Sequence, residues 1–300
     1  MTTIREIDVA VLRDTVARLI VEANYNIPAD ILDALRAAVA REESPLGRHT
    51  LVQLVRNYEV AATERVPVCQ DSGVAVVFLE IGQDVHWVGG SLTDAVHAGI
   101  REGTQAGYLR KSVTGDPTRR LKMAWDPAGP PDRPYERPED RPYDVGIVHI
   151  DIVPGAAVRL TVASKGFGAE NMSALRMLVP ADGVAGIIDV VVDTVERAGA
   201  NACPPVIVGV GVGGTFEAAA LLAKRAALRE LTIRHARPDL ADLESNLLER
   251  INALGIGPQG LGGRVTALAV NIEVLPTHIA GLPVAVNLGC HSTRRMTVEL

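Results

Sequence analysis

The sequence predicts a mixed α/β fold (α+β), with a helical N-terminal part over about residues 1–65 followed by strands and helices. Two observations carry this prediction. Apolar residues recur at helical spacing near the N-terminus, and short apolar runs such as 74–81 and 206–212 end at glycines, as buried strands do. With 300 residues and 47% hydrophobic content, the chain can bury a large core. We expect one domain over residues 1–300.

Composition excludes several classes of function. The net charge is −6 and the 30 basic residues are spread along the chain, so the basic stripe needed to bind nucleic acid is missing. The first residues are charged, and no apolar run of about 18 residues predicts a membrane span. We therefore expect a soluble cytoplasmic protein. Three widely separated cysteines favour reduced thiols or a metal site over disulfides.

The N-terminal helices have recognisable starts. Pro28 and Pro45 each stand where a helix begins, and Ser44 is placed to cap the second of these helices. Apolar residues at helical spacing support the first helix: Val9, Leu12, Val16, Leu19 and Ile20.

Residues 67–73 join these helices to the strand predicted over 74–81, and this turn sets Cys69, Gln70 and Asp71 side by side. A glycine- and proline-containing strand end holds side chains rigidly while leaving them open to a cleft. The alternative is that Cys69 is a small buried hydrophobe and Asp71 a turn former.

A capping-box pattern at residues 91–94 opens a helix that runs toward residue 108, which places Arg110 at or just past its end. There Arg110 could simply stabilise the helix dipole. The proline-rich segment 124–143 is predicted to be a surface loop. Residues 148–153 and 158–163 then suggest two strands of a hairpin joined at Pro154-Gly155.

A glycine loop follows at residues 164–171, where Gly166 and Gly168 would let backbone N–H groups approach an anion. Helices are predicted over 182–198, 215–228 and 238–254. The segment 209–214 matches the dinucleotide pattern G-x-G-x-x-G, but no strand ending in an acidic residue follows about 20 positions later. We expect these glycines to allow close packing of a helix on the strand and to aim that helix's N-terminus at an anionic substrate.

The second and third thiols also lie at strand boundaries. Cys203 precedes the strand 206–212, and Cys290 ends an apolar strand that follows Pro276-Thr277-His278. A glycine-rich loop at 255–263 and a strand at 265–274 come before that segment. Three thiols in irregular positions suit a cluster with three protein ligands, although their spacing alone proves nothing.

Together these stretches resemble the α-region of class I fumarate hydratases and of the related tartrate dehydratases. The resemblance spans nearly the whole chain, and the tail 277–287 is more similar to the fumarase branch. It rests on these segments: Cys69-Gln70-Asp71-Ser72-Gly73, residues 165–171, Cys203-Pro204-Pro205, residues 255–263, and Pro276-Thr277-His278 through Cys290-His291.

The resemblance implies an oxygen-sensitive 4Fe-4S cluster in a cluster-binding cleft, with Cys69, Cys203 and Cys290 as ligands. The iron without a cysteine ligand would act as a Lewis acid on the substrate. Gln70, Arg110 and His278 would bind substrate, together with the glycine loop at Gly166 and Gly168. Asp71 would transfer a proton, with His278 as a second catalytic residue. His278 could alternatively be a structural histidine at the Pro276 turn.

The resemblance also implies a separate β-subunit that completes the active site and a small dicarboxylate substrate. The family usually has an Asn- and Thr-rich loop after its Asp-Pro pair, whereas here Asp116-Pro117 leads into the proline-rich segment. The identity of the dicarboxylate is therefore left open. The expected function is an iron–sulfur hydro-lyase α-subunit acting on fumarate or malate. Alternatives are a tartrate- or mesaconate-type dehydratase subunit and a non-catalytic cluster-binding protein.

Overall fold

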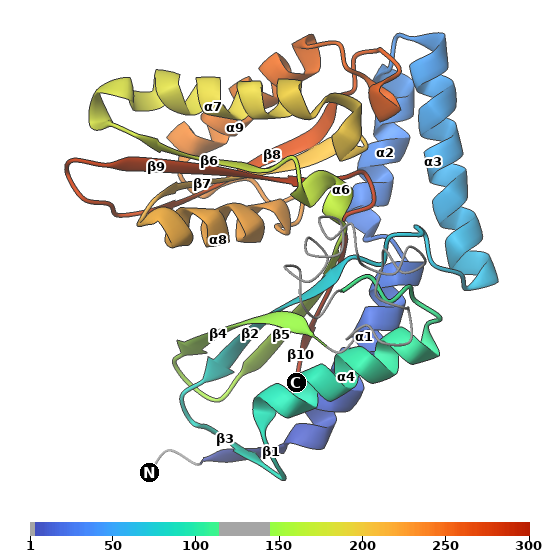
Figure 1. The fold of residues 1–300 in the computed structure, drawn as a ribbon, viewed down its shortest axis with the longest axis vertical. Coiled ribbons are helices and arrows are strands. Elements are labelled where there is room, and N and C mark those ends of the chain that lie inside the picture. The colour runs from blue at the N-terminus through green and yellow to red at the C-terminus, as the bar shows by residue number, and fades with distance from the viewer. Residues whose placement is uncertain (1–3, 114–144) are drawn as a thin grey trace, which may run out of the picture. The chain divides into compact units, whose positions relative to one another are not determined.

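The computed structural model describes residues 4–113 and 145–300, and the chain divides into two units (Figure 1). Unit 1 contains Met1–Tyr25, Cys69–Lys165 and Arg295–Leu300, and unit 2 contains Asn26–Val68 and Gly166–Arg294. The proline-rich loop predicted at 124–143 lies outside the described residues. Neither unit is a continuous stretch of sequence.

Unit 1 is built on a four-stranded sheet in the order β10-β5-β2-β4. Helices α1 (Val9–Tyr25) and α4 (Leu92–Ala106) pack against each other, and they cover the sheet through contacts of α1 with β5 and of α4 with β4. A small parallel pair, β1 (Arg5–Asp8) and β3 (Val85–Val88), adds a second sheet. The main strands are β2 (Val74–Gly82), β4 (Gly146–Val153), β5 (Val158–Lys165) and β10 (Arg294–Glu299).

The hairpin predicted for β4 and β5 is wrong. Both strands exist, but β2 lies between them, parallel to β4 and antiparallel to β5. Five successive residues of β2, from Ala75 to Leu79, are buried. This burial is typical of a strand that pairs with a neighbour on each side in the middle of a sheet. The Pro154-Gly155 connection therefore crosses the end of β2, where the Gly82 N–H donates to Ala157 O at 2.7 Å.

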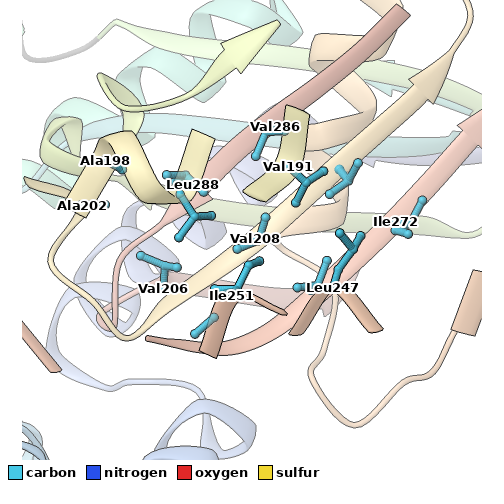
Figure 2. Close-up of a cluster of buried hydrophobic side chains, with 14 of the residues drawn as sticks. Val191, Ala198, Ala202, Val206, Val208, Leu247, Ile251, Ile272, Val286 and Leu288 are labelled. Atoms are coloured by element: carbon cyan, nitrogen blue, oxygen red, sulfur yellow. The ribbon is translucent and has the colours of Figure 1, made fainter. Parts of the chain in front are cut away.

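Unit 2 contains a sheet in the order β6-β9-β7-β8, with α7 and α9 on one face and α8 on the other (Figure 1). The core of unit 2 lies between the sheet and helices α7 and α9. Figure 2 shows Val191 of α7 and Leu247 of α9 on either side of Val208 of β7. The strands are β6 (Ala174–Leu178), β7 (Val206–Gly213), β8 (Ala267–Leu275) and β9 (Leu282–Gly289). The helices are α7 (Gly183–Ala198), α8 (Phe216–Ala227) and α9 (Pro238–Ala253).

The glycines of β7 allow α8 to approach closely, as predicted. A Cβ at Gly209 would lie 2.1 Å from Ala223 O, and one at Gly211 would lie 2.1 Å from Ala219 O. The G-x-G-x-x-G pattern is therefore explained by helix-on-strand packing.

Unit 2 also contains α2 (Ala29–Arg41) and α3 (Pro45–Glu64), which confirms the helical N-terminal part. Ser44 caps α3, because its Oγ accepts a hydrogen bond from Gly47 N. No helix among residues 4–113 and 145–300 is both long and apolar enough to cross a bilayer.

Glu42, between α2 and α3, binds the glycine-rich segment before β8. Glu42 is 1% exposed, and its carboxylate accepts hydrogen bonds from the backbone N–H groups of Ser44 (2.8 Å), Arg264 (3.0 Å) and Val265 (2.8 Å). Burial raises the pKa of this carboxyl, but the backbone donors outweigh that effect and hold the pKa below its ordinary value of 4.5. The ionised form is thus the one the fold stabilises.

We expect Glu42→Gln to lower the free energy of unfolding at pH 7 by about 3 kcal/mol, because an amide cannot satisfy all three donors. Since the folded state lowers the pKa, this stabilisation is complete above the unfolded pKa and is lost as the pH falls through the folded pKa. The difference in unfolding free energy between wild type and Glu42→Gln should therefore become smaller below pH 4.5. Denaturant unfolding at a series of pH values measures it.

The matched control is Glu43→Gln, which removes an exposed carboxylate paired with Arg264 at 2.8 Å. Such surface pairs contribute less than about 1 kcal/mol. Equal losses in the two variants would contradict the role of Glu42.

Candidate active site

The Cys69 turn in unit 1 is held by its own hydrogen bonds. The Asp71 N–H donates to Cys69 Sγ at 3.4 Å, the Cys69 thiol lies 3.4 Å from Gln70 Oε1, and Gly73 N–H donates to Asp71 Oδ1 at 2.8 Å. Cys69 and Asp71 are half-buried and Gln70 is exposed. The turn thus presents a thiol, an amide and a carboxylate whose backbone is fixed.

Arg110 lies beside this turn. Its backbone N–H donates to Ser72 Oγ at 2.9 Å, across 38 positions of sequence. Helix α4 ends at Ala106, so Arg110 stands four residues beyond it and its side chain is exposed. Ser72, Gly73 and Arg110 also border a small cavity of about 30 Å³ inside unit 1, which is room for about one water molecule.

Cys203 and Cys290 lie at one end of the unit 2 sheet. Cys203 precedes β7 and Cys290 follows β9, and these antiparallel strands pair Ile207 with Gly289. The His291 N–H donates to Cys203 O at 3.3 Å, so the two thiol-bearing turns are joined directly. Cys203 has a left-handed backbone (φ 53°), and the glycine-rich loop reaches the same turn through Gln259, whose Nε2 donates to Pro204 O at 2.8 Å.

The surroundings of Cys290 are polar. Its Sγ lies 3.2 Å from Ser292 Oγ, and its carbonyl accepts a hydrogen bond from Thr293 Oγ1 at 2.9 Å. The next residue, His291, hydrogen-bonds through Nδ1 to the hydroxyl of Tyr58 on α3. Burial, with a smaller contribution from Arg294, lowers the pKa of His291 to about 4. This imidazole is therefore neutral at physiological pH.

The glycine loop reaches the same end of unit 2. Gly166 precedes the short helix α6 (Phe167–Glu170), and a Cβ at Gly168 would lie 3.5 Å from Asn201 O, two residues before Cys203. Gly166 has φ −67°, so its backbone does not use the left-handed region. Glu170 of α6 pairs with Lys224 and accepts a hydrogen bond from Asn287 Nδ2 at 2.8 Å.

His278 lies at the opposite end of the unit 2 sheet. It sits in the turn between β8 and β9, where Thr277 Oγ1 donates to Gly214 O at 2.9 Å, just after β7. The N-terminus of α8 lies at that end too. An eight-residue strand spans about 25 Å, and β7 separates His278 from Cys203 by that length. His278 is exposed, and its Nδ1 accepts a hydrogen bond from Ala280 N.

Sequence reasoning assigned no role to four residues that hold these turns: Ser72, Tyr58, His291 and Asn57, whose Nδ2 donates to Val68 O at 3.1 Å. Ser72 and His291 lie inside the motif segments, and that position was the available signal. Tyr58 is 3% exposed on a helix, where its pattern is that of an ordinary core aromatic. Asn57 is an exposed helical residue, so nothing in its context distinguished it.

The fold and site define an α/β protein with three partly buried cysteines that form no disulfide and lie in turns next to strands, beside polar groups suited to an anion. Comparison with known proteins gives the family. The sequence profile described as "Fumarate hydratase (Fumerase)" matches residues 13–299, and the chain belongs to this hydro-lyase family.

Individual relatives carry a second name. A Methanocaldococcus jannaschii protein named "Putative L(+)-tartrate dehydratase subunit alpha" is 37% identical over 291 residues, covering 95% of both chains. The "L(+)-tartrate dehydratase subunit alpha" of Escherichia coli O157:H7 is 31% identical, and that of Escherichia coli K12 is 30% identical. Each of these alignments covers 96% of this chain and 90% of the relative.

Proposed function

We propose that the chain is the α-subunit of an iron–sulfur hydro-lyase that adds water to, or removes it from, a C4 dicarboxylate. The observation that carries this proposal is the hydrogen bond from the His291 N–H to Cys203 O, which joins the two turns that carry the predicted ligands Cys203 and Cys290 at one end of a sheet. Family membership supplies the reaction class.

The donor set fits a 4Fe-4S cluster. Cys69, Cys203 and Cys290 form no disulfide and are partly exposed, and thiolates are the usual ligands of such clusters. Within residues 4–113 and 145–300, no three His, Cys, Asp or Glu side chains gather closely enough to hold a single metal ion. Reduced thiols also suit a cytoplasmic location.

When bound, the cluster would supply a Lewis-acidic iron for the hydroxyl group that leaves or enters. The chain's own residues would hold the rest of the substrate. Arg110 would bind a carboxylate as a two-pronged donor, and the Gln70 amide would donate a further hydrogen bond. Backbone N–H groups near Gly166 and Gly168 would complete this anion site. Asp71, whose carboxylate is oriented by Gly73 N–H, would exchange a proton with the substrate.

A catalytic role for His278 needs a second copy of the chain. Because His278 lies about one eight-residue strand from Cys203 in the same sheet, roughly 25 Å, it cannot reach a substrate bound at that chain's own cysteines. The β8–β9 turn of another copy would have to supply it. Otherwise His278 is the structural histidine of its turn.

We propose fumarate and malate as the first candidate substrates, because the tail 277–287 is similar to fumarases. L(+)-tartrate is the second, because it is named for relatives at 30–37% identity. Those relatives are named as α-subunits, so we also propose a β-subunit partner. Anaerobic reconstitution with that partner, followed by a screen of hydroxy-dicarboxylates, tests the proposal. If the complex takes up its full iron content but turns over none of the hydroxy-dicarboxylates, the hydro-lyase proposal is wrong and the chain is a non-catalytic cluster-binding protein.

We expect Arg110→Lys to raise the KM for the dicarboxylate about 10-fold or more, although the charge is preserved. An ammonium group cannot reproduce the bidentate fork, and that loss amounts to roughly 1.5 kcal/mol or more. Steady-state kinetics of the anaerobic complex measure it. Arg18→Lys, on the exposed side of α1, is the control. An unchanged KM in Arg110→Lys would remove Arg110 from the substrate site.

A further inference from the structure

Helix α3 reaches the segment that carries Cys69. Asn57 Nδ2 donates to Val68 O at 3.1 Å, and Val68 is the residue directly before Cys69. Consecutive Cα atoms are about 3.8 Å apart, so a bond that fixes the Val68 carbonyl also fixes where the Cys69 backbone begins.

The next residue of α3 reaches the segment that carries Cys290. The Tyr58 hydroxyl hydrogen-bonds to His291 Nδ1, and the two rings lie 6.0 Å apart at a tilt of 43°. Tyr58 is 3% exposed and His291 is half-buried, so this contact is partly shielded from water, which strengthens a hydrogen bond.

The third thiol is reached through His291. The same residue whose ring contacts Tyr58 donates its backbone N–H to Cys203 O at 3.3 Å. Two consecutive residues of one helix therefore contact the direct neighbours of two predicted cluster ligands, and one of those neighbours contacts the third ligand.

We infer that α3, through Asn57 and Tyr58, positions all three cysteine-bearing segments. This inference rests on the proposed function, because positioning has a purpose only if the three thiols share one cluster. Asn57 and Tyr58 would act through Val68 and His291, the neighbours of two predicted ligands, so we describe them as positioning residues. Groups that orient metal ligands typically change metal affinity 10- to 100-fold when removed.

The test uses Asn57→Ala, which removes the side-chain amide, and Tyr58→Phe, which removes the hydroxyl. Alanine is favourable in a helix and Asn57 is exposed, so that variant should fold even if the buried one does not. Gln53→Ala, an exposed position one turn earlier on α3, is the matched control. All chains are loaded with iron and sulfide under anaerobic conditions.

The measurement is the rate of iron release to a chelator, together with the electron paramagnetic resonance spectrum of the reduced cluster. We expect both variants to release iron about 10-fold faster than wild type, with an altered spectrum, while Gln53→Ala matches wild type. In the apoprotein, the His291 amide should exchange its hydrogen faster in Tyr58→Phe.

Wild-type release rates and spectra in both variants would overturn the inference and leave the proposed function standing. Faster release with an unchanged spectrum and a lowered unfolding midpoint of the apoprotein would overturn it as well, because general destabilisation gives that result. A wild-type chain that takes up no iron overturns the proposed function, and the inference with it.

Discussion

Cys203→Ser should leave the chain without a stably bound cluster, which is the largest effect we expect from a single substitution. A hydroxyl is a much poorer ligand for iron than a thiolate, and two remaining thiols cannot hold a 4Fe-4S cluster against loss. Iron and sulfide content after anaerobic reconstitution should fall from about four of each per chain to near zero. The brown visible absorption should disappear with them.

The control for this substitution is Asn201→Ala, which changes an exposed side chain in the same turn before β7. The unfolding midpoints of the apoproteins show whether either variant has lost its fold. If Cys203→Ser retained full iron content, Cys203 would not be a ligand, and the joining of its turn to that of Cys290 would need another explanation.

The second large effect concerns the partner. The isolated chain should bind the cluster but show no hydratase or dehydratase activity until a β-subunit is added. Dehydration needs a Lewis acid, a clamp for both carboxylates and a base, held together away from water. In this chain the three cysteines would supply the ligands of the Lewis acid. Gln70 and Arg110 would form part of the carboxylate clamp, and Asp71 is the only candidate base among the residues we propose for the site.

An anaerobic assay with fumarate, malate and L(+)-tartrate, with and without a co-expressed β-subunit, measures this effect. The iron content of both preparations must match, so that a lost cluster is not mistaken for a missing partner. Substantial turnover by the isolated chain would contradict the two-subunit proposal and indicate a self-sufficient site.

The sequence predicted the elements that carry a local signal. Helix α3 was predicted from Ser44 and Pro45, and both lie at its start. β2 and β7 were predicted from continuous apolar runs. The short strands β1 and β3 were missed because four residues carry too little pattern. The hairpin error at β4 and β5 has a different origin, since a local turn signal cannot report that a distant strand lies between its two neighbours.

The candidate site was predictable as a set of loops but not as an arrangement. Sequence motifs singled out Cys69, Cys203, Cys290 and His278 together, yet the direction of each strand decides which sheet end a turn occupies. That direction puts His278 far from Cys203 within unit 2. Tyr58 was missed because a buried aromatic on a helix has the same sequence pattern whether it fills the core or orients a neighbour.

The discontinuity of the two units bears on how the protein is made. β9 lies between β6 and β7 in the sheet of unit 2, and β10 pairs beside β5 in unit 1. Because the ribosome delivers the N-terminal part first, both sheets stay incomplete until residues 282–299 have emerged. Cys290 emerges with this last portion. Nascent chains therefore expose unpaired strands until β9 and β10 are made, and the proposed cluster could be loaded only once Cys290 is available.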